Sequence, residues 1–541
     1  AFATFMELTT TDHFKPEWHA WTAFGAAKAE ALAIDSLRAT RPIEFAVGPP
    51  EEASAMFDVL TYEKGGSVLR MLEQYLGPEA FRKGIAAYLQ EHQYSNTETT
   101  DLWDAIETSS GEPVRSIMDS WIFQGGYPIV SVEAGDDGRS IKLHQRRFSY
   151  DLGETTGGER GDGDSGERWS VPVNLRASIG GQVVRERALL NDSSTTVTFA
   201  GEVEWVIVND GAWGFYRVGY SDELLDRLVA NAGGPRERGI GALERMALVG
   251  DTWARVVAGD SDLGSWVSLV SHLGEEDDPD VWSALLGPLD LLDKVTDEAD
   301  RPALQTYVRE LAGPLLERLG WDPDAGEDQR QGTLRSRLIA ALGILAADEE
   351  VRAMAARRFA AYQDDGSAIH PDLVTAVVHV VASAGGAEAY ETMKRRLRGA
   401  TTPQEEVRYL YALAQSDDAE LLRQTLDTSL TDEVRSQDAP MLVGRVLANR
   451  AGATMAWQWI EDHWDEALDR FPANIFIRMV DGVTSLVDPA EAERARAWLG
   501  THRIPQAGPR LAQLLEQMDI NMAFRRRVAP CLAAALAGKQ R

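Results

Sequence analysis

Cysteine is almost absent from this sequence of 541 residues, which contains only Cys531. A single thiol excludes an internal disulfide framework and any metal site built from several thiolates. Because alanine, proline and leucine surround Cys531, we expect its thiol to be buried. The sequence also lacks any uncharged apolar run near the roughly 20 residues that span a bilayer, and no signal peptide opens it. We therefore expect a folded cytoplasmic protein.

Basic residues are too few to balance the acidic ones. The sequence has 54 lysines and arginines against 85 aspartates and glutamates, a net charge of −31. A surface of that sign repels phosphate backbones and anionic lipid head groups, so we expect neither nucleic acid nor a membrane among the partners. The hydrophobic content of 44% is ordinary for globular proteins and excludes collagen-like, coiled-coil and disordered classes. The length predicts three or four domains.

Motifs for several kinds of catalytic site are missing. None of the nine histidines is followed by glutamate and no two are four residues apart; the nearest pair, His13 and His19, is six apart. A His-Glu-x-x-His zinc helix is therefore absent, as are a phosphate-binding P-loop and a Gly-x-Ser-x-Gly nucleophile elbow. We expect this chain to bind no metal, and its histidines to be structural or exposed to solvent.

The hydrophobic pattern changes twice along the chain. Up to about residue 125 it is helical, as in residues 67–76, where apolar positions recur three and four apart before Gly77. Short β-type runs separated by turn residues occupy 126–220, and amphipathic helical segments fill 221–541. The pattern predicts a multidomain, mainly α protein: helices over 1–125, a small antiparallel β-sandwich over 126–220, and a large irregular α-solenoid over 221–541.

The segment around Tyr62 stands apart from the rest. Tyr62 lies just before Gly65 and Gly66, at the predicted start of a helix, where its hydroxyl could face a cleft and donate a hydrogen bond. The residues alone leave core packing of the ring as the more ordinary alternative.

This segment resembles the aminopeptidase N family of zinc metallopeptidases, which includes the endoplasmic reticulum aminopeptidases. Similar pieces occur in family order along the chain. They are residues 1–8, 41–44, 57–58, 62–65 with 68–72, 96–97 with 101–103, 121 with 124–128, 209 with 214–220, and 448–450 with Gly452, Trp457, Trp464 and Phe471. Residues 222–440 contribute only helical character to the resemblance.

The resemblance implies a fold and roles for two residues. Residues 1–125 would be the helical C-terminal half of a thermolysin-like catalytic domain, and 221–541 a solenoid of HEAT-like type. In such enzymes two histidines and a glutamate hold zinc, which activates water, while a tyrosine hydroxyl donates to the oxyanion of the tetrahedral intermediate. Tyr62 matches that tyrosine. Phe57 matches an aromatic wall of the pocket for the first substrate side chain, with core packing as its alternative.

The chain departs from the family because the zinc helix, the third zinc ligand and the loop that holds the substrate's α-amino group would all precede Ala1. We therefore expect the C-terminal part of a zinc aminopeptidase that removes N-terminal residues from peptides. This part alone would be inactive and would have the missing N-terminal half as its partner. The alternatives are a non-catalytic peptide- or protein-binding α-solenoid and an epoxide-opening relative of the leukotriene hydrolase kind.

Overall fold

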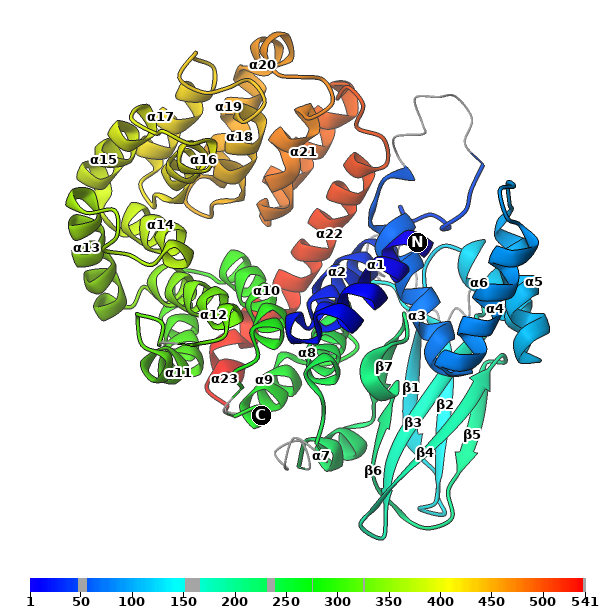
Figure 1. The fold of residues 1–541 in the computed structure, drawn as a ribbon. Coiled ribbons are helices and arrows are strands. Elements are labelled where there is room, and N and C mark those ends of the chain that lie inside the picture. Colours follow the sequence, from blue (N-terminus) through cyan, green and yellow to red (C-terminus); the bar gives the residue numbers. More distant parts are fainter. Residues whose placement is uncertain (47–55, 151–165, 231–238, 275, 325, 539–541) are drawn as a thin grey trace. The chain divides into compact units, whose positions relative to one another are not determined.

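Helices make up most of the chain, with a smaller β region between residues 128 and 220 (Figure 1). The computed structural model describes residues 1–541 except 47–55, 151–165, 231–238, 275, 325 and 539–541. The chain forms two units, residues 1–276 (unit 1) and 277–541 (unit 2). The prediction of a mainly helical protein with small sheets is confirmed.

Unit 1 begins with six α-helices, and the third follows the predicted pattern closely. These are α1 (Phe2–Phe14), α2 (Ala20–Asp35), α3 (Gly65–Leu76), α4 (Pro78–Glu91), α5 (Thr99–Ser110) and α6 (Val114–Ile122). In α3, Val68, Leu72 and Tyr75 lie on one buried face. The helix ends because Gly77 has φ of +86°, a left-handed conformation that glycine adopts at no steric cost.

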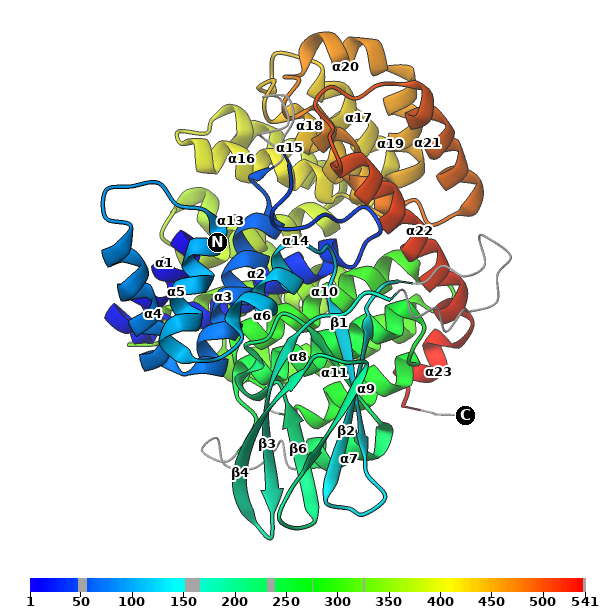
Figure 2. The same ribbon diagram turned by 90° about the vertical axis from the view of Figure 1, so that its right-hand side faces the viewer.

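Seven strands follow in two sheets. They are β1 (Pro128–Ala134), β2 (Ser140–Arg147), β3 (Val171–Ile179), β4 (Gln182–Leu190), β5 (Ser194–Thr198), β6 (Val203–Val208) and β7 (Arg217–Tyr220). One sheet has the order β5-β2-β1-β7 and the other β4-β3-β6; in Figure 2 the strands β4, β3 and β6 lie side by side. The strand pairs are antiparallel as predicted except β1 with β7, which are parallel.

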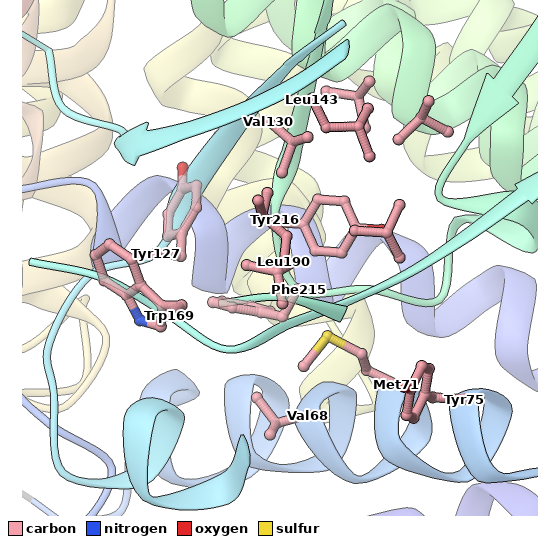
Figure 3. Packing of buried hydrophobic residues seen from close by; sticks show 14 of the residues in the cluster. Val68, Met71, Tyr75, Tyr127, Val130, Leu143, Trp169, Leu190, Phe215 and Tyr216 are labelled. Carbon is pink, nitrogen blue, oxygen red and sulfur yellow. The ribbon is translucent and has the colours of Figure 1, made fainter. Parts of the chain in front are cut away.

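One hydrophobic core joins both sheets to α3. Val130 and Leu143 come from one sheet and Leu190 from the other, while Val68 and Met71 reach the same cluster from α3 (Figure 3). Each fully buried aliphatic side chain of this kind contributes about 1.5–3 kcal/mol of transfer free energy. The start of α3, which follows Tyr62, is therefore anchored by the β region.

Three further helices belong to unit 1. They are α7 (Asp222–Ala230), α8 (Ala242–Ala258) and α9 (Leu263–His272), of which α7 and α8 contact strands β6 and β7. The predicted division into domains at 125 and 220 stays a prediction.

Unit 2 contains the remaining α-helices of the described chain. They are α10 (Pro279–Val295), α11 (Arg301–Leu319), α12 (Gln329–Ala340), α13 (Glu349–Asp364), α14 (Val374–Ala384), α15 (Gly386–Arg398), α16 (Pro403–Ala412), α17 (Ala419–Ser429), α18 (Ala439–Ala448), α19 (Ala453–Asp462), α20 (Trp464–Arg470), α21 (Pro489–Thr501), α22 (Arg510–Val528) and α23 (Leu532–Leu536). Neighbours in sequence pack together, as α13 with α14 and α17 with α18 do. The solenoid of HEAT-like type stays a prediction.

The last helices of unit 2 return to its first ones. Helix α22 contacts α10, and α23 contacts α11 (Figure 1). Arg525 of α22 pairs with Asp297, just after α10, at 2.8 Å, and Arg450 pairs with Glu298. The row of helices is thereby closed into a ring.

Cys531 corrects one prediction, because its side chain is exposed. It ends a short 3-10 turn (Ala529–Cys531), and its thiol donates to the Val528 carbonyl at 3.4 Å. Leu532 and Leu536 are buried in its place. Across the described residues, the helices are too short or too polar to cross a membrane.

His379 is the histidine whose environment is most unusual. It lies on α14, its Nε2 is buried, and the described residues give that atom no hydrogen-bond partner. Burial lowers the pKa of His379 to about 4, and the positive charges of Arg445 and Arg408 act in the same direction. The folded chain therefore binds a proton here less readily than the unfolded chain.

This imbalance predicts an acid-dependent loss of stability. Between pH 6.5 and 4 the unfolded chain binds the proton and the folded chain does not, so the free energy of unfolding falls by up to about 3 kcal/mol as pH drops through that range. His379→Gln should lose less stability than the wild type between pH 7.5 and 4.5 in urea denaturation. His370→Gln, at a half-exposed position of the same unit, is the control. Parallel pH profiles for the wild type and His379→Gln would contradict the assignment.

Candidate functional site

Tyr62 lies in one turn of π-helix, Leu60–Lys64, that leads directly into α3. The Asp58 carboxylate caps this turn: its Oδ1 accepts from the backbone N–H of Leu60 at 3.0 Å and of Thr61 at 3.1 Å. Turns of π-helix are rare and often occur at functional sites, because the wider turn changes the direction of its side chains. The local sequence thus builds an unusual turn and places Tyr62 in it.

Arg41 holds the cap of this turn in place. Its Nη2 donates to Asp58 Oδ1 at 2.5 Å and to Thr61 Oγ1 at 3.0 Å, and its Nη1 donates to the Pro42 carbonyl at 2.8 Å. A guanidinium in contact with both the capping carboxylate and the turn fixes their relative position. The Arg41-Pro42 pair noted in the sequence is therefore a support for the turn that carries Tyr62.

A buried ion pair fixes the other end of the turn. Lys64 Nζ lies 2.8 Å from Asp35 Oδ2, and neither side chain is exposed to solvent. Lys64 also donates to the Gly126 carbonyl at 3.1 Å, and Asp35 Oδ1 accepts from the Gly126 N–H at 2.9 Å and from Thr40 Oγ1 at 2.5 Å. The pair therefore joins the end of α2, the π-turn and the segment that enters β1.

Gly65 and Arg70 complete the support of α3. A Cβ at Gly65 would lie 2.5 Å from the Cβ of Ala1, so the close approach of these two residues requires glycine. One turn further, the Arg70 guanidinium lies 4.3 Å from the ring centres of both Trp21 and Trp213. These cation–π contacts hold α3 against Trp21 of α2 and against Trp213, which precedes β7.

The two predicted site residues lie together at the surface of unit 1. The Tyr62 side chain is 37% exposed and Phe57 75% exposed, with ring centres 6.3 Å apart. Core packing, the alternative for each, is therefore wrong. Within the described part of the chain the Tyr62 hydroxyl has no hydrogen-bond partner, so it is free to donate to a bound molecule.

The surroundings of Tyr62 are acidic. Burial raises the pKa of the Glu63 carboxyl, and the nearby carboxylates of Glu30 and Asp58 act in the same direction. These acids do not form a metal site, because no three histidine, cysteine, aspartate or glutamate side chains among the described residues are grouped to hold an ion. The resemblance implies zinc ligands that would precede Ala1, and the described residues do not offer a second set.

The sequence motif points to Tyr62, whose role stays a prediction, but sequence reasoning missed the residues that position it. Lys64 is one of only eight lysines, in a chain with 46 arginines, and stands within the Tyr-x-Lys-Gly motif, which is a usable signal. Asp35 carries no such signal, because its partner is distant in the sequence. Arg41 and Asp58 stand in the motifs, although the sequence does not show that they meet.

The comparisons with known proteins cover most of the chain. The family model described as "Peptidase family M1 domain" matches residues 1–121, and "ERAP1-like C-terminal domain" matches residues 205–520. "Aminopeptidase M1" of Arabidopsis thaliana is 32% identical over 96% of this chain and 60% of its own length. The "Puromycin-sensitive aminopeptidase" of Caenorhabditis elegans is 32% identical over 87% of this chain and 49% of its own. The chain thus spans about half to three-fifths of these relatives.

The Lys64–Asp35 pair predicts a specific loss of stability. Lys64→Met should lower the free energy of unfolding of the full chain by about 3–5 kcal/mol in urea denaturation, because the Asp35 carboxylate stays buried without its cation. Lys15→Met, which removes an exposed ion pair with Glu17, is the matched control and should change little.

A double variant separates the charge from the packing. Lys64→Met combined with Asp35→Asn should be more stable than Lys64→Met alone, since no unpaired charge remains. Equal losses for Lys64→Met and Lys15→Met would show that the pair does not support the fold.

Proposed function

Because the chain belongs to the M1 family of aminopeptidases, we propose that it is the C-terminal portion of a zinc aminopeptidase that removes N-terminal residues from peptides. By itself the chain does not hydrolyse them. The single observation that carries this proposal is the Tyr62 hydroxyl, exposed and without a partner among the described residues, on a turn held at both ends.

Tyr62 acts in this proposal as the donor to the oxyanion of the tetrahedral intermediate. A donor helps in the transition state only if it is already in place when charge develops on the oxygen. The Arg41–Asp58 contact and the Lys64–Asp35 pair support such preorganisation, because each fixes the backbone within two or four residues of Tyr62.

Phe57 contributes to substrate binding in the same proposal. An aromatic ring that is 75% exposed next to Tyr62 offers an apolar wall for the first side chain of a peptide. The zinc is proposed to bind to residues of the N-terminal half, the partner that completes the site, and a cytoplasmic location is part of the same proposal. A purely peptide- or protein-binding solenoid would not require the free hydroxyl of Tyr62.

In the full-length enzyme that we propose, Tyr62→Phe should lower kcat for chromogenic aminoacyl amides by about 100- to 1,000-fold. KM should change far less, since the hydroxyl interacts with charge that develops only in the transition state. Tyr94→Phe, at a fully exposed tyrosine of the same unit, is the control and should leave both constants unchanged. A near-normal kcat for Tyr62→Phe would remove Tyr62 from the mechanism.

The 541-residue chain alone should not hydrolyse the same substrates with or without added zinc. Elemental analysis of the purified chain should show far less than one zinc per molecule, because its described residues offer no ligand group. Stoichiometric zinc, or hydrolysis that a chelator abolishes, would contradict this part of the proposal.

A further inference from the structure

Unit 2 contains a cavity of about 640 Å³ that is open to solvent. Its lining comes from α10, α11, α12, α13, α14 and α18, together with the turns after α12, α16 and α18. The volume is in the range of pockets that hold small molecules. The lining also includes the apolar side chains Leu286, Ile344 and Leu345.

Basic side chains outnumber acidic ones around this cavity. The lining has six cationic residues, Lys294, Arg301, Arg337, Arg352, Arg445 and Arg450, against the three aspartates Asp290, Asp293 and Asp417. This balance is the reverse of that of the whole chain, which carries a net charge of −31. A local excess of positive charge in a concave, partly apolar site strengthens the positive electrostatic potential there, and this potential attracts anions.

Three of the cations are neutralised within the unit. Arg301 pairs with Asp293 at 2.8 Å, Arg450 pairs with Glu298, and the Lys294 ammonium lies close enough to Asp290 to influence its ionisation. Burial raises the pKa of that Asp290 carboxyl to about 6, so it ionises less readily than an exposed aspartate. These contacts leave Arg337, Arg352 and Arg445.

These three arginines have no carboxylate within ion-pair distance among the described residues. Arg352 Nε donates to the Gly343 carbonyl at 2.8 Å. Arg337 Nη1 donates to the Pro279 carbonyl at 3.2 Å and also to Ser283 Oγ. The Arg445 guanidinium lies 4.1 Å from the ring centre of Tyr411. Each side chain is thus held in position while most of its N–H donors stay available.

Arginines held in this way suit an anion with several oxygen atoms. A guanidinium has five N–H donors in a rigid fork that matches phosphate and carboxylate groups. Arg352 uses only its Nε on the protein, so both Nη groups remain free to bind. The three arginines come from three different helices, α12, α13 and α18, which suits a ligand with more than one anionic group.

We propose that this cavity binds a small polyanion that carries two or more phosphate or carboxylate groups. The arginines supply the charge-assisted hydrogen bonds, and the apolar lining residues contact the carbon skeleton of the ligand. The site is independent of peptide hydrolysis, so its failure would leave the proposed function unaffected, and the reverse holds as well.

Isothermal titration of the full chain with pyrophosphate and with tricarballylate tests the proposal. Both titrations use constant ionic strength, because salt screens long-range attraction. At least one probe should bind with submillimolar affinity and a stoichiometry of one. A phosphate ligand predicts tighter pyrophosphate, and a polycarboxylate ligand predicts tighter tricarballylate. Absence of binding by both probes overturns the proposal.

Matched variants locate the site. Arg352→Gln should weaken binding about tenfold or more, whereas Arg357→Gln should change it less than about twofold. Arg357 lies on the same helix and is exposed, outside the cavity lining, so it controls for the loss of one positive charge. Equal losses in the two variants would show diffuse attraction and overturn the site.

A second variant keeps the test valid if Arg352→Gln fails to fold. Arg445→Gln removes a cation that makes no hydrogen bond to the Gly343 turn, and it should weaken the same probe about tenfold or more while circular dichroism matches the wild type. Arg352→Lys should restore part of the affinity, because it keeps the charge but loses the planar fork. Wild-type affinity in Arg445→Gln would contradict the proposal.

Discussion

The position of Tyr62 depends on the buried contact between Lys64 and Asp35. Two opposite charges without solvent are costly to bury, and the attraction between them compensates only when hydrogen bonds satisfy their remaining polar atoms. Here the backbone of Gly126 and the hydroxyl of Thr40 provide those bonds. The arrangement is complete only when the end of α2, the π-turn and the start of β1 have all come together. The geometry around Tyr62 is thus a property of the whole of unit 1.

This dependence separates two groups of residues around the candidate site. Tyr62 and Phe57 face solvent and contribute little to packing, so they are free to serve binding and chemistry. Lys64, Asp35 and Arg70 contact no substrate in the proposal, yet they hold the turn and α3 in place. The position of a functional side chain at the surface is fixed by neighbouring residues that are themselves buried.

The sequence predicts the features that depend on nearby residues and misses those that depend on distant ones. The helix α3 was predictable because apolar residues recur three and four apart and Gly77 ends the pattern. The parallel pairing of β1 with β7 was not predictable, because the hydrophobic pattern of a strand does not determine which strand it pairs with. The prediction that Cys531 is buried failed for a similar reason. Apolar neighbours in the sequence do not decide which side of a turn faces the core. The motif points to Tyr62, whose role stays a prediction, whereas the pairing of Lys64 with Asp35 has no local signature in the sequence.

The return of α22 and α23 to α10 and α11 changes how unit 2 is expected to come apart. An open row of helical repeats can fray from either terminus, one repeat after another, because each repeat touches only its neighbours. When the last helices of a row pack against its first helices, neither terminus is free, and unfolding has no end from which to start. Because α22 packs against α10 and α23 against α11, with Arg525 and Asp297 paired beside this contact, unit 2 is expected to unfold as one cooperative unit and not from its termini.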